Sequence, residues 1–84
     1  MTWSKLDIRR ARKIELLPIL VARGYKFLQR PHHNYQLRDF GRLVVRENYW
    51  VWPEKNLKGN AIDFFIHVEN KTFWQAMEIL MPKA

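Results

Sequence analysis

The run Leu-Val-Val-Arg-Glu-Asn-Tyr-Trp-Val-Trp-Pro, at residues 43–53, decides the fold class. Its β-branched and aromatic residues favour extended structure on both sides of the Glu-Asn pair at residues 47–48, which fits a tight hairpin turn. Pro53 cannot donate a hydrogen bond to a sheet and therefore ends the second strand. The run predicts an antiparallel hairpin with strands over 43–46 and 49–52.

Side chains alternate between the two faces of a strand. In the second strand of the hairpin, Trp50 and Trp52 therefore share one face, and Tyr49 and Val51 share the other. Helices must cover one face of a sheet this small, so we expect at least half of its aromatic residues to belong to the core.

Shorter segments extend the sheet around the hairpin. Alternation predicts a strand over 35–38, and a turn follows it at 39–41. The remaining expectations are an extended segment at 25–28, a connection at 31–34 and a polar loop at 54–58. Together they predict an antiparallel meander of three or four short strands.

Helix signals lie on both sides of this meander. Ser4, Asn60 and Thr72 are suitable side-chain caps for helices that start just after them. Another helix starts near residue 14 or 15, because Pro18 is accepted only in a first turn, and it ends at Gly24. The last two helices are expected at 61–68 and 73–80. The predicted order is α-α-β-β-β-α-α, an α+β fold with one domain over residues 1–84.

Composition narrows the chemistry. The chain has 84 residues, 48% hydrophobic, which is enough for one modest core. It has no cysteine, which excludes disulfides, thiol nucleophiles and cysteine-based zinc sites. The longest apolar stretch, at 16–22, is interrupted by Pro18 and is far too short for a membrane span. With no secretory signal visible, we expect a cytoplasmic monomer without a cofactor, either complete or a fragment of a longer protein.

The charge balance points to an anionic partner. Fifteen Lys and Arg residues stand against eight Asp and Glu residues, a net charge of +7. Nucleic acid is the first partner that such a balance favours, ahead of a membrane surface or an acidic protein.

The C-terminal half resembles the zinc-binding domain of bacterial primases. The resemblance rests on Gly-Asn-Ala-Ile-Asp-Phe at 59–64 and Thr-Phe-Trp-Gln-Ala-Met-Glu-Ile-Leu at 72–80, and extends over roughly residues 14–80. Asn34 and Tyr35 also match the start of the first strand of that family's sheet. The resemblance implies a zinc-ribbon-like sheet with flanking helices, and DNA binding.

The expected zinc ligands are missing. Trp52 and Lys55 stand where the family has a cysteine pair, and its first ligand pair falls near Arg38 and Gly41. None of these residues can form the tetrahedral site. The resemblance therefore implies a metal-free, degenerate version, similar to those in proteins of conjugative plasmids and transposons. Without the Toprim domain that often follows such fingers, no catalysis is implied.

Aromatic packing is expected to replace the metal. A cluster of aromatic residues can supply burial energy that a structural zinc supplies elsewhere. This hypothesis fails if chelators unfold the domain. The cluster comprises Tyr35, Phe40, Tyr49, Trp50, Trp52, Phe64, Phe65, Phe73 and Trp74.

Basic and aromatic residues alternate in the sheet region, which is typical of a groove for single-stranded nucleic acid. The candidate nucleic-acid-binding residues are Tyr35, Arg38, Arg42, Arg46, Tyr49, Trp52, Lys55 and Lys58. The structural alternative is that the aromatics are core and the charges a solvated face. The first helix offers a second patch, which can grip phosphates, solubilise the helix or contact an acidic protein: Arg9, Arg10, Arg12 and Lys13.

These observations favour a non-enzymatic module that binds single-stranded or forked DNA in replication or transfer of a mobile element. One alternative is an adaptor that docks to a replication or conjugation protein, and another is a dimeric regulator that binds duplex DNA. His32, His33 and His67 lack the partners that a metal site needs. The acidic residues show no catalytic spacing, and the three glycines are isolated.

Overall fold

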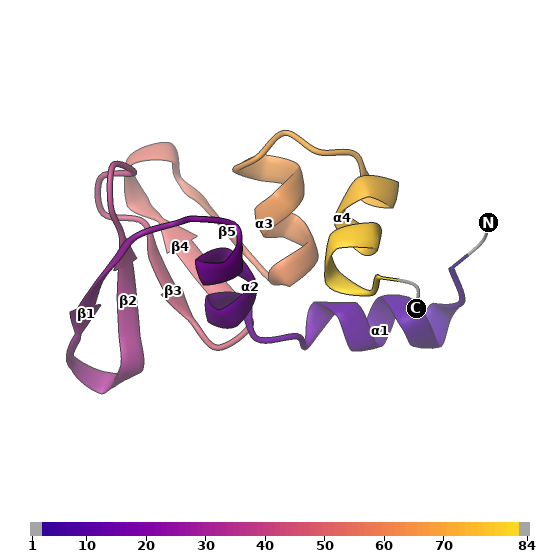
Figure 1. Cartoon of the computed structure of the whole chain (residues 1–84). Coiled ribbons are helices and arrows are strands. Elements are labelled where there is room, and N and C mark those ends of the chain that lie inside the picture. Colours follow the sequence, from indigo (N-terminus) through magenta and orange to yellow (C-terminus); the bar gives the residue numbers. More distant parts are fainter. Residues whose placement is uncertain (1–2, 83–84) are drawn as a thin grey trace.

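A five-stranded antiparallel sheet and four α-helices form the α+β architecture of the computed structural model, which describes residues 3–82 (Figure 1). The strands pair in chain order: β1 Phe27–Arg30, β2 Asn34–Leu37, β3 Val44–Arg46, β4 Tyr49–Trp52 and β5 Leu57–Gly59. The helices are α1 Lys5–Arg12, α2 Leu16–Ala22, α3 Ala61–His67 and α4 Phe73–Leu80. Short 3₁₀ turns, η1 Pro31–His33 and η2 Pro53–Lys55, connect β1 to β2 and β4 to β5.

The sheet is larger than the three or four strands that the sequence predicts. The expected polar loop at 54–58 gives way to β5, which pairs with β4 from Trp52↔Leu57 to Trp50↔Gly59. A strand of three residues shows no alternation of its own, so only the pairing reveals it. Strand β1 begins two residues later than the expected extended segment and pairs Phe27 with Leu37.

The predicted helix caps Ser4, Asn60 and Thr72 are confirmed. Three helices begin with reciprocal capping boxes, in which the cap accepts a backbone hydrogen bond and a side chain three residues later returns one. The pairs are Ser4 with Asp7, Asn60 with Asp63, and Thr72 with Gln75. Helix α2 begins at Leu16, slightly later than the expected residue 14 or 15, and Pro18 falls in its first turn as predicted. It ends at Ala22, so Gly24 lies just beyond the helix.

The core lies on one face of the sheet. Leu37, Val45 and Trp50 point from neighbouring strands into a cluster that includes Leu20 of α2 and Phe64 of α3. The Trp50 indole is 1% exposed, and its Nε1 donates to the backbone carbonyl of Asn60 at 2.9 Å. The Trp50 and Phe64 rings meet edge to face at 5.8 Å. Helices α2 and α3 therefore cover the same face.

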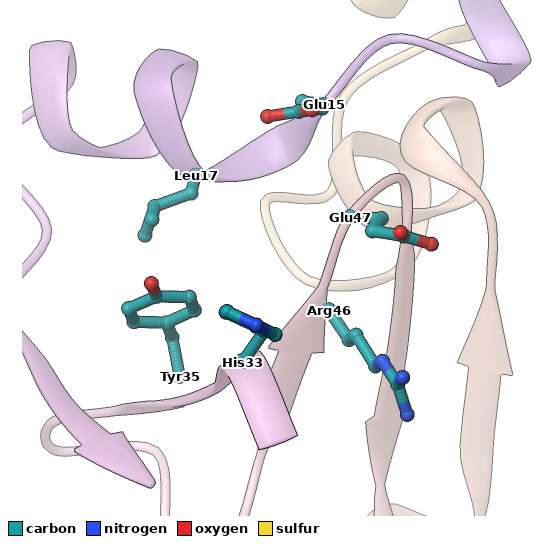
Figure 2. A pocket seen from close by; sticks show the side chains of 6 residues that line it. All are labelled: Glu15, Leu17, His33, Tyr35, Arg46 and Glu47. Carbon is teal, nitrogen blue, oxygen red and sulfur yellow. The ribbon is translucent and has the colours of Figure 1, made fainter. Parts of the chain in front are cut away.

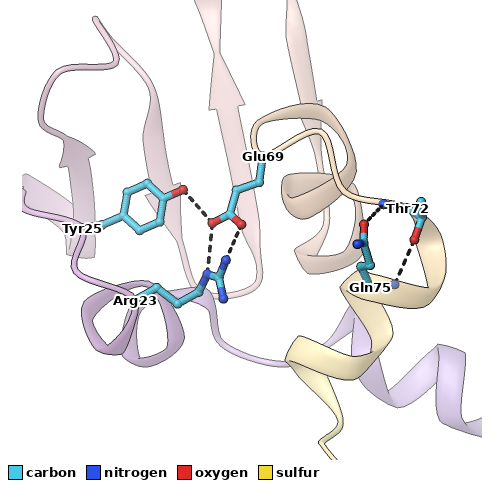
Figure 3. Close-up of polar contacts among 5 residues, drawn as sticks. All are labelled: Arg23, Tyr25, Glu69, Thr72 and Gln75. Atoms are coloured by element: carbon cyan, nitrogen blue, oxygen red, sulfur yellow. Dashed lines mark hydrogen bonds and ion pairs between the residues drawn. The ribbon is translucent and has the colours of Figure 1, made fainter.

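Glu69, just after α3, links the end of this helix to the segment that follows α2 (Figure 3). Its side chain is 10% exposed and accepts hydrogen bonds from Tyr25 Oη at 2.7 Å and Arg23 Nε at 3.1 Å. The Arg23 guanidinium also lies over the Phe65 ring, 5.4 Å from its centre. Burial, followed by the hydrogen bond to Glu69, raises the pKa of Tyr25 well above its usual value. The hydrogen bond to Glu69 also raises the pKa of Arg23.

This cluster predicts a loss of stability at high pH. Folding raises the pKa of Tyr25, so its contribution is complete below about pH 10 and falls as the pH rises further. Denaturant unfolding between pH 9 and about pH 11 should therefore show a steeper decline in the free energy of unfolding for the native chain than for Tyr25→Phe.

Glu69→Ala should lower the free energy of unfolding at pH 7 by about 2 kcal/mol, because it removes charge-assisted hydrogen bonds.

Glu78→Ala is the matched control, because this exposed carboxylate forms no ion pair within residues 3–82. Equal losses for Glu69→Ala and Glu78→Ala, or parallel pH curves for the native chain and Tyr25→Phe, would contradict this account.

Candidate nucleic-acid interface

Among residues 3–82, no helix covers the second face of the sheet, and we call it the open face. One row of cross-strand partners crosses all five strands on this face: Leu28, Gln36, Val44, Val51 and Lys58. A further row holds the pairs Arg30↔Asn34 and Arg46↔Tyr49. Every residue in the two rows is exposed or half-buried. The open face is therefore accessible along its whole width.

The open face is cationic. Lys26 and Arg38 extend it at one end, where Arg38 N donates to the Lys26 carbonyl at 2.9 Å and continues the β1–β2 ladder. No strand contains an acidic residue, and the two ion pairs among the described residues involve none of these cations. The cations of the open face are Lys26, Arg30, Arg38, Arg46 and Lys58.

Apolar groups lie between these charges. Tyr49 is 44% exposed and Leu28 is 49% exposed, while Val44 and Val51 are half-buried beside them. Tyr49 is the one aromatic residue that the five described strands place on this face, as the register of the strands requires. The open face thus presents an aromatic side chain and aliphatic surface among its positively charged side chains.

Four of the eight candidate residues from the sequence lie together here: Arg38, Arg46, Tyr49 and Lys58. The other four lie elsewhere. Tyr35 is on the covered face, edge to face with Phe27 at 6.4 Å. Trp52 packs against Phe40 at 5.7 Å, and Lys55 lies over the Trp52 ring at 5.8 Å. The charge of Arg42 is paired with Glu54.

Sequence reasoning did not select Lys26 and Arg30. Both lie in or next to β1, and Arg30 Nε donates to Gln36 Oε1 on the open face at 3.0 Å. Placing the extended segment two residues too early hid their position. The alternation of Leu28 and Arg30 is the signal that identifies them once β1 is placed correctly.

Two loops that are distant in the sequence, at residues 38–42 and 52–55, come together in this chain. Residues 38–42 and 52–55 meet through the Phe40–Trp52 ring contact and through Glu54, which accepts from the Arg42 amide at 2.9 Å. Hydrogen bonds from its own backbone amide and from Arg42 lower the pKa of Glu54. Gly41 has a positive φ of 63°, and a Cβ there would lie 2.7 Å from Glu54 Oε2. Aromatic packing and a carboxylate clamp thus join the loops.

A hollow of about 260 Å³ lies beside the open face, where Arg46 borders both (Figure 2). The hollow also brings together residues from α2 and its N-cap, η1, β2 and the β3–β4 turn: Glu15, Leu17, His33, Tyr35 and Glu47. His33, which lines the hollow, follows His32, and the two residues have positive φ angles of 61° and 63°. Its mixed acidic and basic lining differs from the purely cationic open face.

Residues 3–82 form neither a metal-binding cluster nor a membrane-spanning helix. This part of the chain contains no group of three or more His, Asp or Glu side chains placed to hold a metal ion. None of its helices has the length and apolar character needed to cross a membrane. Comparisons with protein-family models, curated proteins and solved structures return no significant match.

The loop contact predicts stability that is independent of metal. Phe40→Ala should lower the free energy of unfolding by about 2 kcal/mol, because it removes a half-buried ring and its edge-to-face contact. Tyr49→Ala, which truncates an exposed ring of the same sheet, should change it by less than about 0.5 kcal/mol. EDTA should leave the thermal midpoint of the native chain unchanged. A fall in that midpoint with EDTA would show that a metal, not the aromatic contact, holds the loops.

Proposed function

We propose that this chain is a non-enzymatic module that binds single-stranded DNA on the open face. The observation that carries the proposal is an uncovered five-stranded surface with an exposed tyrosine, in which the strands carry Arg30, Arg46 and Lys58 and no acidic residue. Lys26 and Arg38 add two cations next to β1 and β2. Lysine and arginine follow phosphates, and an exposed ring accepts an unpaired base at about 1–3 kcal/mol per stacked base.

The shape of the face favours a single strand over a duplex. Five strands spaced by about 4.8 Å give a surface about 19 Å wide, comparable with a short single-strand site of about four nucleotides. Bases in a duplex are stacked on each other and cannot stack on Tyr49. The described helices lie on the other side of the sheet, so no helix on the open face is available to enter a major groove.

We further infer that the domain is a metal-free relative of the primase-type zinc-binding domain, used in replication or transfer of a mobile element. The sequence signature at 59–64 and 72–80 supports this inference. The contact between loops 38–42 and 52–55 adds support, because in that family a metal ion would join these loops.

An adaptor role is the second candidate, and Trp74 favours it. This side chain on α4 is 48% exposed beside the Phe73 ring. Exposed tryptophans often anchor protein interfaces. In this role Trp74, rather than the open face, would contact a replication or conjugation protein.

The DNA-binding proposal is tested with a fluorescently labelled single strand of about 12 nucleotides, long enough for one site. Arg46→Ala/Lys58→Ala should weaken binding at low salt at least about tenfold and reduce the salt slope by about 2, because two phosphate contacts are lost. Tyr49→Ala should weaken binding by about 1–3 kcal/mol with little change in the salt slope, because it removes stacking.

The matched control is Lys55→Ala/Lys71→Ala, which removes the same charge away from the open face. Equal losses of affinity in the two double variants would show that binding depends on net charge alone, which would contradict a site on the open face. No binding by the native chain at low salt would overturn the proposal and leave the adaptor role.

A further inference from the structure

The structure points to a second DNA grip on α1, and we propose that the chain binds a junction between single- and double-stranded DNA. In this arrangement α1 holds the phosphates of the duplex arm, while the open face holds the single strand. The inference rests on the proposed function of the open face and extends it to a specific DNA geometry.

Helix α1 concentrates positive charge on its solvent side. The exposed cations of α1 and its C-cap are Lys5, Arg9, Arg10, Arg12 and Lys13. On a helical wheel they occupy one half of the helix, opposite the buried Ala11. The acidic Asp7 already accepts the Ser4 backbone amide at 3.1 Å in the capping box. None of the five cations takes part in an ion pair among the described residues.

The α1 surface suits a duplex because it offers charge without stacking groups. Its exposed face carries five cations and Leu6, but no aromatic side chain. A duplex presents closely spaced phosphates and no free base faces, so a cationic helix can bind its backbone without stacking. The open face, with Tyr49 between its cations, has the complementary chemistry for unpaired bases.

The two surfaces are joined rigidly at the β3–β4 turn. Asn48 Nδ2 donates to the Arg12 carbonyl at 2.7 Å, and Leu16 N donates to the Glu47 carbonyl at 2.9 Å. These bonds fix the C-terminal end of α1 next to the end of the open face that carries Arg46 and Tyr49. Helix α1 itself packs against α3 and α4 and projects away from β1 and β2 (Figure 1).

Acidic residues separate the two cationic surfaces. Glu15 and Glu47 line the hollow between the start of α2 and the β3–β4 turn (Figure 2). Carboxylates at this position repel a phosphate backbone that would run straight from one surface to the other. The charge pattern is therefore that of two separate grips, as a junction requires, and differs from one continuous single-strand track.

The test compares three labelled DNAs: a single strand of about 12 nucleotides, a duplex of about 12 base pairs, and the same duplex with a single-strand tail. Tails of both polarities are included. Because the two grips are linked in one rigid domain, the tailed duplex should bind at least about tenfold more tightly than the single strand. Arg9→Gln/Lys13→Gln should abolish this gain and lower the salt slope on the tailed duplex by about 2, while single-strand affinity stays within about twofold.

Lys55→Gln/Lys71→Gln is the matched control, because it removes the same charge outside both surfaces and should retain the gain. A native chain that binds the tailed duplex no better than the single strand would overturn the junction and leave the open-face proposal intact. Equal loss on single strand and tailed duplex in the α1 variant would also overturn it, because α1 would then belong to the single-strand site. No single-strand binding at all would instead contradict the proposed function itself.

Discussion

Trp50 is the residue on which the organisation of this domain depends. It lies in the second-last strand of the sheet with Val45 on one side and Gly59 on the other, and its indole nitrogen reaches the Asn60 carbonyl at the start of α3. One side chain therefore connects three strands and a helix. Asp63 accepts a hydrogen bond from the Asn60 amide at this helix start. Its carboxylate lies so close to Gly59 that a Cβ there would be 2.5 Å from it. Glycine at this position lets Asp63 reach back and cap α3.

This one-sided core determines which face of the sheet is accessible to solvent. The buried strand residues Leu37, Val45 and Trp50 all project to the helices, so alternation forces their neighbours onto the open face. A larger protein would cover that face with another layer. Here it stays accessible to solvent, and its side chains do not pack against a described helix. The same physical cause that builds the core thus exposes the cationic surface.

Much of this arrangement could be predicted from the sequence. The hairpin at 43–52 and the capping boxes are local features, because a turn or a cap is specified by residues close together in the chain. Strand β5 could not be predicted in this way, since its three residues become a strand only by pairing with β4. Likewise, Trp52 belongs with the core because Phe40, twelve positions earlier, lies against it. Alternation in the sequence correctly placed Trp50 and Trp52 on one face of β4 and Tyr49 and Val51 on the other. It could not show which of the two faces the helices cover.

The distribution of acidic residues explains how a chain of net charge +7 keeps its cations available. Four of its eight carboxylates act within the fold, two in capping boxes and two in ion pairs: Asp7, Asp63, Glu54 and Glu69. These carboxylates cap helices or pair with Arg23 and Arg42. Among the described residues, the cations of α1 and the open face therefore have no acidic partner in an ion pair. Such clustering of like charge opposes the compact state. A polyanion bound to these surfaces would relieve this repulsion in the folded form, so its binding would raise the stability of the folded state by mass action.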